Sequence, residues 1–216
     1  MNINKYIDHT NLKPFATEAD IAKLCAEAIE YSFASVCVNP AYVPQAKKLL
    51  ANSGILVCTV IGFPLGMNRT AIKERETVDA LEMGCDEFDM VINVGALKDK
   101  KYGYVEREIF AIVRAAAGKA VKVIIETGLL EDNEKAIATR IACGVGARFV
   151  KTCTGVSAGV ATVEDILLMK ANLGGTAQIK ASSGIKTYET AMQLIEAGAA
   201  RLGTSAGIAI VSGQKG

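Results

Sequence analysis

The sequence has 216 residues, which is long enough for one domain with a full hydrophobic core. Half of the residues are hydrophobic, 22% are charged and the formal net charge is +1, as in an ordinary globular protein. No basic block and no membrane-length apolar run stands out, so nucleic acid and membrane are not expected as partners.

Short apolar runs alternate along the chain with segments whose apolar residues recur at helical spacing. The runs predict eight β-strands, at residues 6–8, 35–38, 56–61, 87–92, 122–126, 149–152, 178–181 and 201–203. Seven helical patterns accompany them. Thr17 is expected to cap the first helix, and glycines are expected to end several others, at Gly84, Gly118, Gly144 and Gly198.

Eight βα units in this length predict an α/β fold, a (β/α)8 TIM barrel that forms a single domain over residues 1–216. A doubly wound open sheet is the alternative. It usually has fewer strands, and its GxGxxG fingerprint does not follow the first strand here. Only about a dozen residues follow the eighth strand, so the C-terminal helix is expected to be short or missing.

Three predicted strands carry a charged residue in the middle, where burial on both faces makes a charge costly. These residues are Asp89, Lys151 and Lys180. Period-2 alternation turns all three toward the barrel interior. Lys151 and Lys180 lie on neighbouring strands near the C-terminal ends, where barrel enzymes form their active sites.

Two neighbouring ammonium groups repel each other, and burial adds to the effect, so both lower the pKa of a lysine. A lysine with a pKa near neutrality can attack a carbonyl, and Asp89 can exchange protons with it. The alternative is that the three residues form an ion-pair network that only fills the barrel.

Small residues follow the last two predicted strands, in the segments 181–187 (ASSGIKT) and 203–207 (GTSAG). Their backbone can approach an anion closely, and loops seven and eight are the usual phosphate site of this fold. Gly155 offers another backbone donor, and Lys186 a counter-charge. These loops predict a phosphorylated substrate.

Cysteine and histidine usage argues against a metal site. The six cysteines form no CxxC pair and lie mostly inside apolar segments, which indicates buried thiols in a reducing cytoplasm. His9 is the only histidine, and nothing near it supports a zinc site or a Ser-His-Asp triad. We therefore expect a cytoplasmic protein whose chemistry needs no metal or other cofactor.

Seven segments over most of the chain resemble the deoxyribose-phosphate aldolase family. They are IDHTNLKP (7–14), VCVNP (36–40), VIGFPLG (60–66), DEFDMVINVG (86–95), FVKTCTG (149–155), IKAS (179–182) and GTSAG (203–207).

The resemblance implies a role for each matching position. Lys151 matches the Schiff-base lysine, Lys180 a second lysine that tunes it, and Asp89 the acid of a proton relay. The other matches are Asp8 and Thr10 beside the relay, Cys37 near the mouth of the site, Thr154 near the substrate hydroxyls, and Gly155, Gly184, Gly203 and Ser205 at the phosphate. Ser183 and Lys186 lie at the same phosphate loop but depart from the family pattern.

The implied activity is that of a lyase in carbohydrate degradation: reversible cleavage of 2-deoxy-D-ribose 5-phosphate to D-glyceraldehyde 3-phosphate and acetaldehyde, without a cofactor. A homodimer or homotetramer is expected. Two other hypotheses stay open. One is another phosphate-binding barrel, either a different Schiff-base aldolase or a sugar-phosphate isomerase. The other is a sugar-phosphate-binding barrel without activity.

Four positions depart from the family pattern. Cys153 stands in place of Ser, Ser183 in place of the first Gly of a Gly-Gly pair, Lys186 in place of Arg, and Ala206 in place of a second Ser. The last three concern phosphate affinity. Ser183 can still donate hydrogen bonds if its backbone need not adopt a positive φ. The C-terminal tail also lacks the tyrosine that some members bring to the active site.

Overall fold

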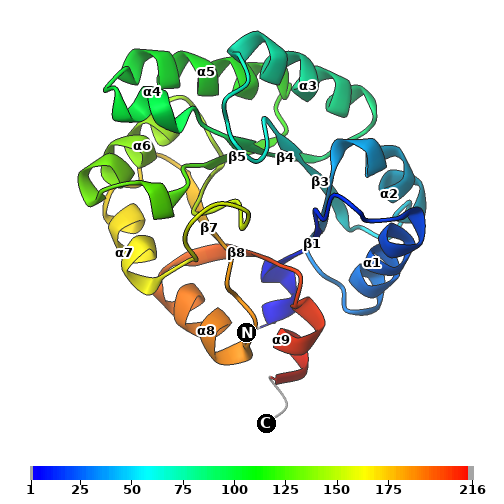
Figure 1. The fold of residues 1–216 in the computed structure, drawn as a ribbon. Coiled ribbons are helices and arrows are strands. Elements are labelled where there is room, and N and C mark those ends of the chain that lie inside the picture. Colours follow the sequence, from blue (N-terminus) through cyan, green and yellow to red (C-terminus); the bar gives the residue numbers. More distant parts are fainter. Residues whose placement is uncertain (1, 214–216) are drawn as a thin grey trace.

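Eight parallel strands close into a barrel, in sequence order and with β8 paired to β1. The computed structural model describes residues 2–213. Helices surround the ring of strands on the outside (Figure 1), and the predicted (β/α)8 barrel is confirmed. The strands are β1 (Ile7–Asn11), β2 (Ser35–Val38), β3 (Leu56–Ile61), β4 (Glu87–Val91), β5 (Ala120–Ile124), β6 (Phe149–Lys151), β7 (Gln178–Ser182) and β8 (Ala199–Thr204).

The helices follow the strands as the apolar spacing predicts. They are α1 (Glu18–Glu30), α2 (Val43–Leu49), α3 (Thr70–Glu82), α4 (Val94–Lys98), α5 (Tyr102–Ala115), α6 (Asp132–Gly144), α7 (Val163–Ala171), α8 (Tyr188–Ala197) and α9 (Gly207–Gly213), with short 3-10 turns η1 (Ile3–Tyr6), η2 (Pro40–Tyr42) and η3 (Thr127–Leu129).

The helix ends agree with the sequence in most places. Thr17 caps α1 in a capping box with Asp20. Gly84 and Gly198 have positive φ where α3 and α8 end. Gly144 also ends its helix, as expected. It is the last residue of α6, and Gly146 adopts the left-handed conformation two residues later.

Successive strand residues alternate between two environments. Phe88 and Met90 of β4 are buried in the hydrophobic core that the helices share, whereas Asp89 between them meets charged groups inside the barrel. The same alternation places Val150 in the core and Lys151 beside Asp89. The helices therefore pack on an apolar outer face, and the interior is left to polar side chains.

The C-terminal helix is short, as expected. α9 contacts η1 and β1, so the two ends of the described chain lie side by side, as the red and blue segments of Figure 1 show. Residues 214–216 of the tail lie outside the described residues. Within residues 2–213, no helix is long and apolar enough to cross a membrane.

Candidate active site

The three charged residues singled out in the strands meet inside the barrel. Lys151 and Lys180 are register partners on β6 and β7. Each donates a hydrogen bond from Nζ to the same oxygen, Oδ2 of Asp89 on β4, and both distances are 2.7 Å. All three side chains are buried. Asp89 is thus a bridge between the two lysines.

Lys122 of β5 is a third lysine in this cluster, and the sequence reasoning missed it. Its Nζ lies 3.0 Å from Oδ1 of Asp89 and 2.7 Å from Oε2 of Glu87. The signal was present, because Lys122 lies mid-strand between valines just as Lys151 follows Val150. Applying the buried-charge criterion to every strand would have found it.

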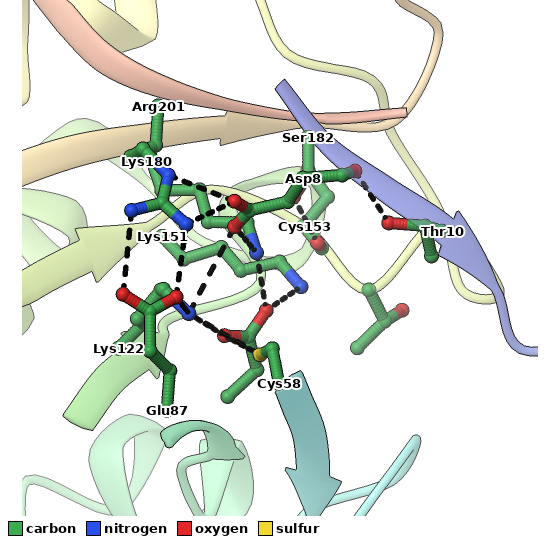
Figure 2. Close-up of polar contacts among 12 residues, drawn as sticks. Asp8, Thr10, Cys58, Glu87, Lys122, Lys151, Cys153, Lys180, Ser182 and Arg201 are labelled. Carbon is green, nitrogen blue, oxygen red and sulfur yellow. Dashed lines mark hydrogen bonds and ion pairs between the residues drawn. The ribbon is translucent and has the colours of Figure 1, made fainter. Parts of the chain in front are cut away.

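Asp8 and Arg201 extend the cluster toward β1 and β8 (Figure 2). The Arg201 guanidinium donates to both Asp8 and Glu87, and Lys180 Nζ lies 2.6 Å from Asp8 Oδ2. Asp8, which the resemblance placed beside the relay, does contact it. Arg201 and Glu87 were not anticipated as part of the site.

Opposite charges decide the protonation of this cluster. Burial alone would raise the pKa of Asp89, but Lys122 and the other lysines hold that pKa well below its usual range. Burial would likewise raise the pKa of Asp8, yet Lys180 and Arg201 lower it.

Lys180 does not behave as the sequence reasoning expected. Burial would lower its pKa, and so would a neighbouring ammonium, but Asp8 and Asp89 outweigh both and raise it. The expected lowering is therefore wrong for Lys180. The physical reason is that each of its carboxylate neighbours lies within about one hydrogen-bond length, a feature that strand spacing alone does not reveal.

Lys151 is the lysine that opens to solvent. It lines a cavity of about 640 Å³ at the C-terminal end of the barrel, whereas Lys122 and Lys180 lie behind it. Its ion-pair partner is Asp89, while Lys180 also pairs with Asp8, and Lys122 also pairs with Glu87. Lys151 is thus both the accessible lysine and the least neutralised one.

The residues assigned to the substrate gather around the same cavity. Its wall contains every position that the sequence assigned to substrate or phosphate, together with Thr10 from β1: Thr154, Gly155, Ser183, Gly184, Lys186, Gly203 and Ser205. The loops after β6, β7 and β8 therefore face Lys151 across one space.

Ser183 adopts a positive φ, the conformation that was expected to interfere with its role as a hydrogen-bond donor to phosphate. Its φ is +81°, followed by +77° at Gly184. A left-handed conformation costs a non-glycine residue about 1–2 kcal/mol. The hydroxyl of Ser183 donates to the Gly159 carbonyl at 3.1 Å, so it joins the β7 loop to the β6 loop and does not point freely into the cavity.

Cys37 lies deeper than the expected position at the mouth. It is 1% exposed and forms a small interior cluster with Cys58 and Val60. A hydrogen bond with Cys58 lowers the pKa of its thiol. Among residues 2–213, the sulfurs of these cysteines and an Asp89 oxygen lie close enough to hold a metal ion, within 4.8 Å of one another. The ammonium groups already paired with Asp89 would repel such a cation.

A parallel barrel with a lysine open to a cavity at its C-terminal end defines a barrel enzyme of the aldolase type. The chain belongs to the DeoC/LacD family of aldolases, whose model matches residues 3–213.

Named relatives agree over the whole length. The chain is 56% identical over 215 residues to a deoxyribose-phosphate aldolase of Macrococcus caseolyticus, covering 100% of this chain and 98% of that one. It is 55% identical over 216 residues to one of Clostridium tetani, covering 100% of both. The tetrameric structure of the deoxyribose phosphate aldolase from Aeropyrum pernix superposes with a TM-score of 0.90 at 32% identity, over 99% of this chain and 91% of that one.

Proposed function

We propose that the chain is a deoxyribose-phosphate aldolase, which reversibly cleaves 2-deoxy-D-ribose 5-phosphate to D-glyceraldehyde 3-phosphate and acetaldehyde. One observation carries the proposal. Lys151 lines a cavity that is also lined by the small-residue loops after β7 and β8. An aldehyde can reach the amine while a phosphate at the other end of the same sugar lies against those loops.

The buried cluster around Asp89 carries more positive than negative groups. Four cations, Lys122, Lys151, Lys180 and Arg201, face three carboxylates, Asp8, Glu87 and Asp89, which leaves a formal charge of +1. Loss of one proton brings this buried cluster to neutrality. Lys151 is the lysine of this cluster that lines the cavity and has one carboxylate partner, so it is the amine that a substrate carbonyl can reach.

The reaction then follows from the position of this amine. Lys151 Nζ adds to the C1 aldehyde of the open-chain sugar, and loss of water gives a protonated imine. The C3 hydroxyl loses its proton, the C2–C3 bond breaks, and its electron pair moves into the imine to form an enamine. Glyceraldehyde 3-phosphate leaves. Protonation at C2 and hydrolysis release acetaldehyde and restore the amine.

Asp89 and Lys180 are the groups we assign to proton transfer. They share a hydrogen bond, and Asp89 also contacts Lys151, so a proton taken from the C3 hydroxyl can pass within the pair and return to C2. Asp8 pairs with Lys180 and is itself held by Arg201, so this pair keeps the Lys180 amine in place.

The phosphate is assigned to the loops after β6, β7 and β8. Gly155, Gly184 and Gly203 leave room for the backbone to approach an anion, and Lys186 lines the same part of the cavity as a counter-charge. Ser183 takes the place of a glycine here at the cost of backbone strain.

Borohydride trapping with acetaldehyde tests the proposal. We expect a reduced ethyl adduct on the peptide that contains Lys151, and cleavage of deoxyribose 5-phosphate by the same preparation. Lys186→Met is the matched control, because it removes a cavity-lining lysine without touching the cluster and should still be trapped. An adduct on another lysine, or no adduct in folded protein, would contradict the mechanism and favour an isomerase or a binding protein.

We also propose that the protein forms a homodimer or homotetramer in the cytoplasm. The tetramer reported for the Aeropyrum pernix relative supports an oligomer, and the exposed Leu65 and Met67 near the barrel mouth offer apolar contact surface. The six unpaired cysteines favour a reducing compartment. Light scattering at micromolar concentration should give two or four times the 22.8 kDa chain mass.

A further inference from the structure

Glu126 lies just after β5 in a conformation that is unusual for its residue type. Its backbone is left-handed, with φ +58° and ψ +66°. Its side chain is 2% exposed and does not line the cavity. A strained, buried acid next to the lysine-bearing strand is a costly arrangement, and it has no part in the charged cluster.

The left-handed residue shifts the pairing between the chain after β5 and the chain after β6. Ile125 N donates to the carbonyl of Lys151, and Thr127 N donates to the carbonyl of Thr152. Two residues on one side thus match one residue on the other, as in a β-bulge. The shift turns the Glu126 side chain toward the loop that follows Lys151.

The carboxylate of Glu126 binds the backbone of that loop. The N–H of Thr154 donates to both of its oxygens, at 3.1 and 3.3 Å. The hydroxyl of Thr154 in turn accepts from the N–H groups of Val156 and Ser157, which closes the loop into a turn. Glu126 is therefore the anchor from which Thr154 and Gly155 reach the cavity.

The same loop is held from its other side by β7. Ser182 Oγ donates to the carbonyl of Cys153 at 2.6 Å, and both residues appear beside the cluster in Figure 2. Farther along, Gly128 packs against Ala158 and Gly159 of the β6 loop. The approach is so close that a Cβ on Gly128 would lie 2.2 Å from the Ala158 carbonyl oxygen. The β6 loop is thus clamped between two neighbours, and Glu126 supplies the charged contact.

We infer that Glu126 is a positioning residue that sets where Thr154 and Gly155 stand relative to Lys151, and so sets the affinity for the phosphorylated sugar. The inference rests on the proposed function for its substrate. Glu126 does not touch the reacting atoms. Without its carboxylate, the Thr154 N–H loses a buried acceptor and the loop can rotate that N–H toward the cavity, which moves Gly155 away from the phosphate.

Two variants of Glu126 test the inference. Glu126→Gly removes the carboxylate and accepts the left-handed backbone without strain, so the fold is retained. Glu126→Gln keeps an oxygen that can accept from Thr154 N. We expect KM for deoxyribose 5-phosphate to rise about tenfold in the Gly variant, as for the loss of one buried hydrogen bond to a charged group, and about twofold or less in the Gln variant.

Three readouts separate positioning from a general structural role. Borohydride trapping of acetaldehyde on Lys151 and kcat for unphosphorylated deoxyribose should change about twofold or less in Glu126→Gly, because Glu126 does not touch the reacting atoms. An unchanged KM for the sugar phosphate would overturn the inference. A parallel fall in trapping and in cleavage of both sugars would also overturn it, since that outcome marks general damage.

Inorganic phosphate provides a test that does not depend on the reaction. Titration calorimetry should show about tenfold weaker phosphate binding in Glu126→Gly than in the wild-type protein. If the wild-type protein binds phosphate but cleaves no deoxyribose 5-phosphate, the proposed function fails and this comparison still decides the role of Glu126. Equal phosphate binding by the two proteins would contradict that role.

Discussion

Two buried ion-pair sites lie on opposite faces of the same barrel wall. One is the interior cluster around Asp89. The other is the pair Lys73–Glu108, between the strands and helices α3 and α5, with Nζ and Oε1 2.8 Å apart and both side chains fully buried. Lys73 also donates to the Val91 carbonyl, and Glu108 accepts from Asn93 N–H.

The two sites respond to burial in opposite ways. Burial raises the pKa of Glu108 and lowers that of Lys73, because their one ion pair, even with Glu76 near Lys73, does not offset the loss of water around each charge. In the interior cluster, Asp89 and Lys180 shift the other way, toward their charged forms. The number of opposite charges within reach therefore decides whether a buried charge persists.

This difference suits the two sites to different tasks. The Lys73–Glu108 pair is enclosed, and its hydrogen bonds secure the chain after β4. The interior cluster keeps Asp89 and Lys180 charged and places Lys151 at a cavity, where a substrate can reach it. The Lys73–Glu108 pair is therefore structural, and the cluster around Asp89 is suited to catalysis.

Lys151→Ala should have the largest effect. We expect kcat for deoxyribose 5-phosphate cleavage to fall about 10⁴-fold or more, because the nucleophile is lost. The fold should persist, since Asp89 keeps Lys122 and Lys180 as partners. Steady-state kinetics with circular dichroism provide the measurement. Retention of most activity would refute the assignment of the nucleophile.

Lys73→Met should act on stability and leave the chemistry alone. Removing one partner of a buried pair costs about 3–5 kcal/mol, although the raised pKa of Glu108 allows it to take up a proton and reduce that loss. Urea unfolding gives the free energy, and acetaldehyde trapping in the folded protein gives the control. A variant as stable as the wild type but without trapping would reverse the roles assigned to the two sites.

The pH dependence of stability should also distinguish the sites. The pKa of Asp89 in the folded state lies below its ordinary value of 3.8. Its contribution is therefore present above about pH 4 and is lost as the pH falls through the lowered pKa of the folded state. Glu108 has a raised pKa, so its contribution is present below its ordinary value of 4.5 and is lost as the pH rises.

Asp89→Asn should accordingly flatten the fall in unfolding free energy between about pH 4 and pH 2, measured by urea titration at each pH. Glu108→Gln is the matched control and should leave that fall in place. If both variants gave the same profile, the opposite responses of the two sites would be refuted.

An exposed ion pair should contribute least to the unfolding free energy. Lys98 pairs with Glu134 at 2.9 Å, but its side chain is 44% exposed. Lys98→Met should change the unfolding free energy by about 0.5 kcal/mol or less, because water already screens the pair. Salt titration of both proteins checks this. If Lys98→Met lowered the unfolding free energy as much as Lys73→Met, burial would not determine how much an ion pair contributes to stability.

The sequence by itself determined the barrel and the central part of the site. Strand and helix periodicities identified eight βα units, and alternation turned Asp89, Lys151 and Lys180 inward, because both properties depend on residues close together in the chain. Lys122 obeyed the same rule and could have been found. Small residues after the predicted strands also assigned Gly155, Gly184 and Gly203 to one anion site, and all three line the same cavity.

The tertiary structure decided what depends on distances across the barrel. Arg201 lies 193 residues from Asp8 in the chain, and no local pattern indicates that the two meet. Likewise, Lys180 meets Asp8 and Asp89 from distant strands, and these two carboxylates reverse the expected direction of its pKa shift. The positive φ of Ser183, the depth of Cys37 and the anchor at Glu126 likewise arise where separate strands and loops come together. Local patterns determine which way a side chain points, whereas charge state and backbone strain depend on the neighbours that closure of the barrel provides.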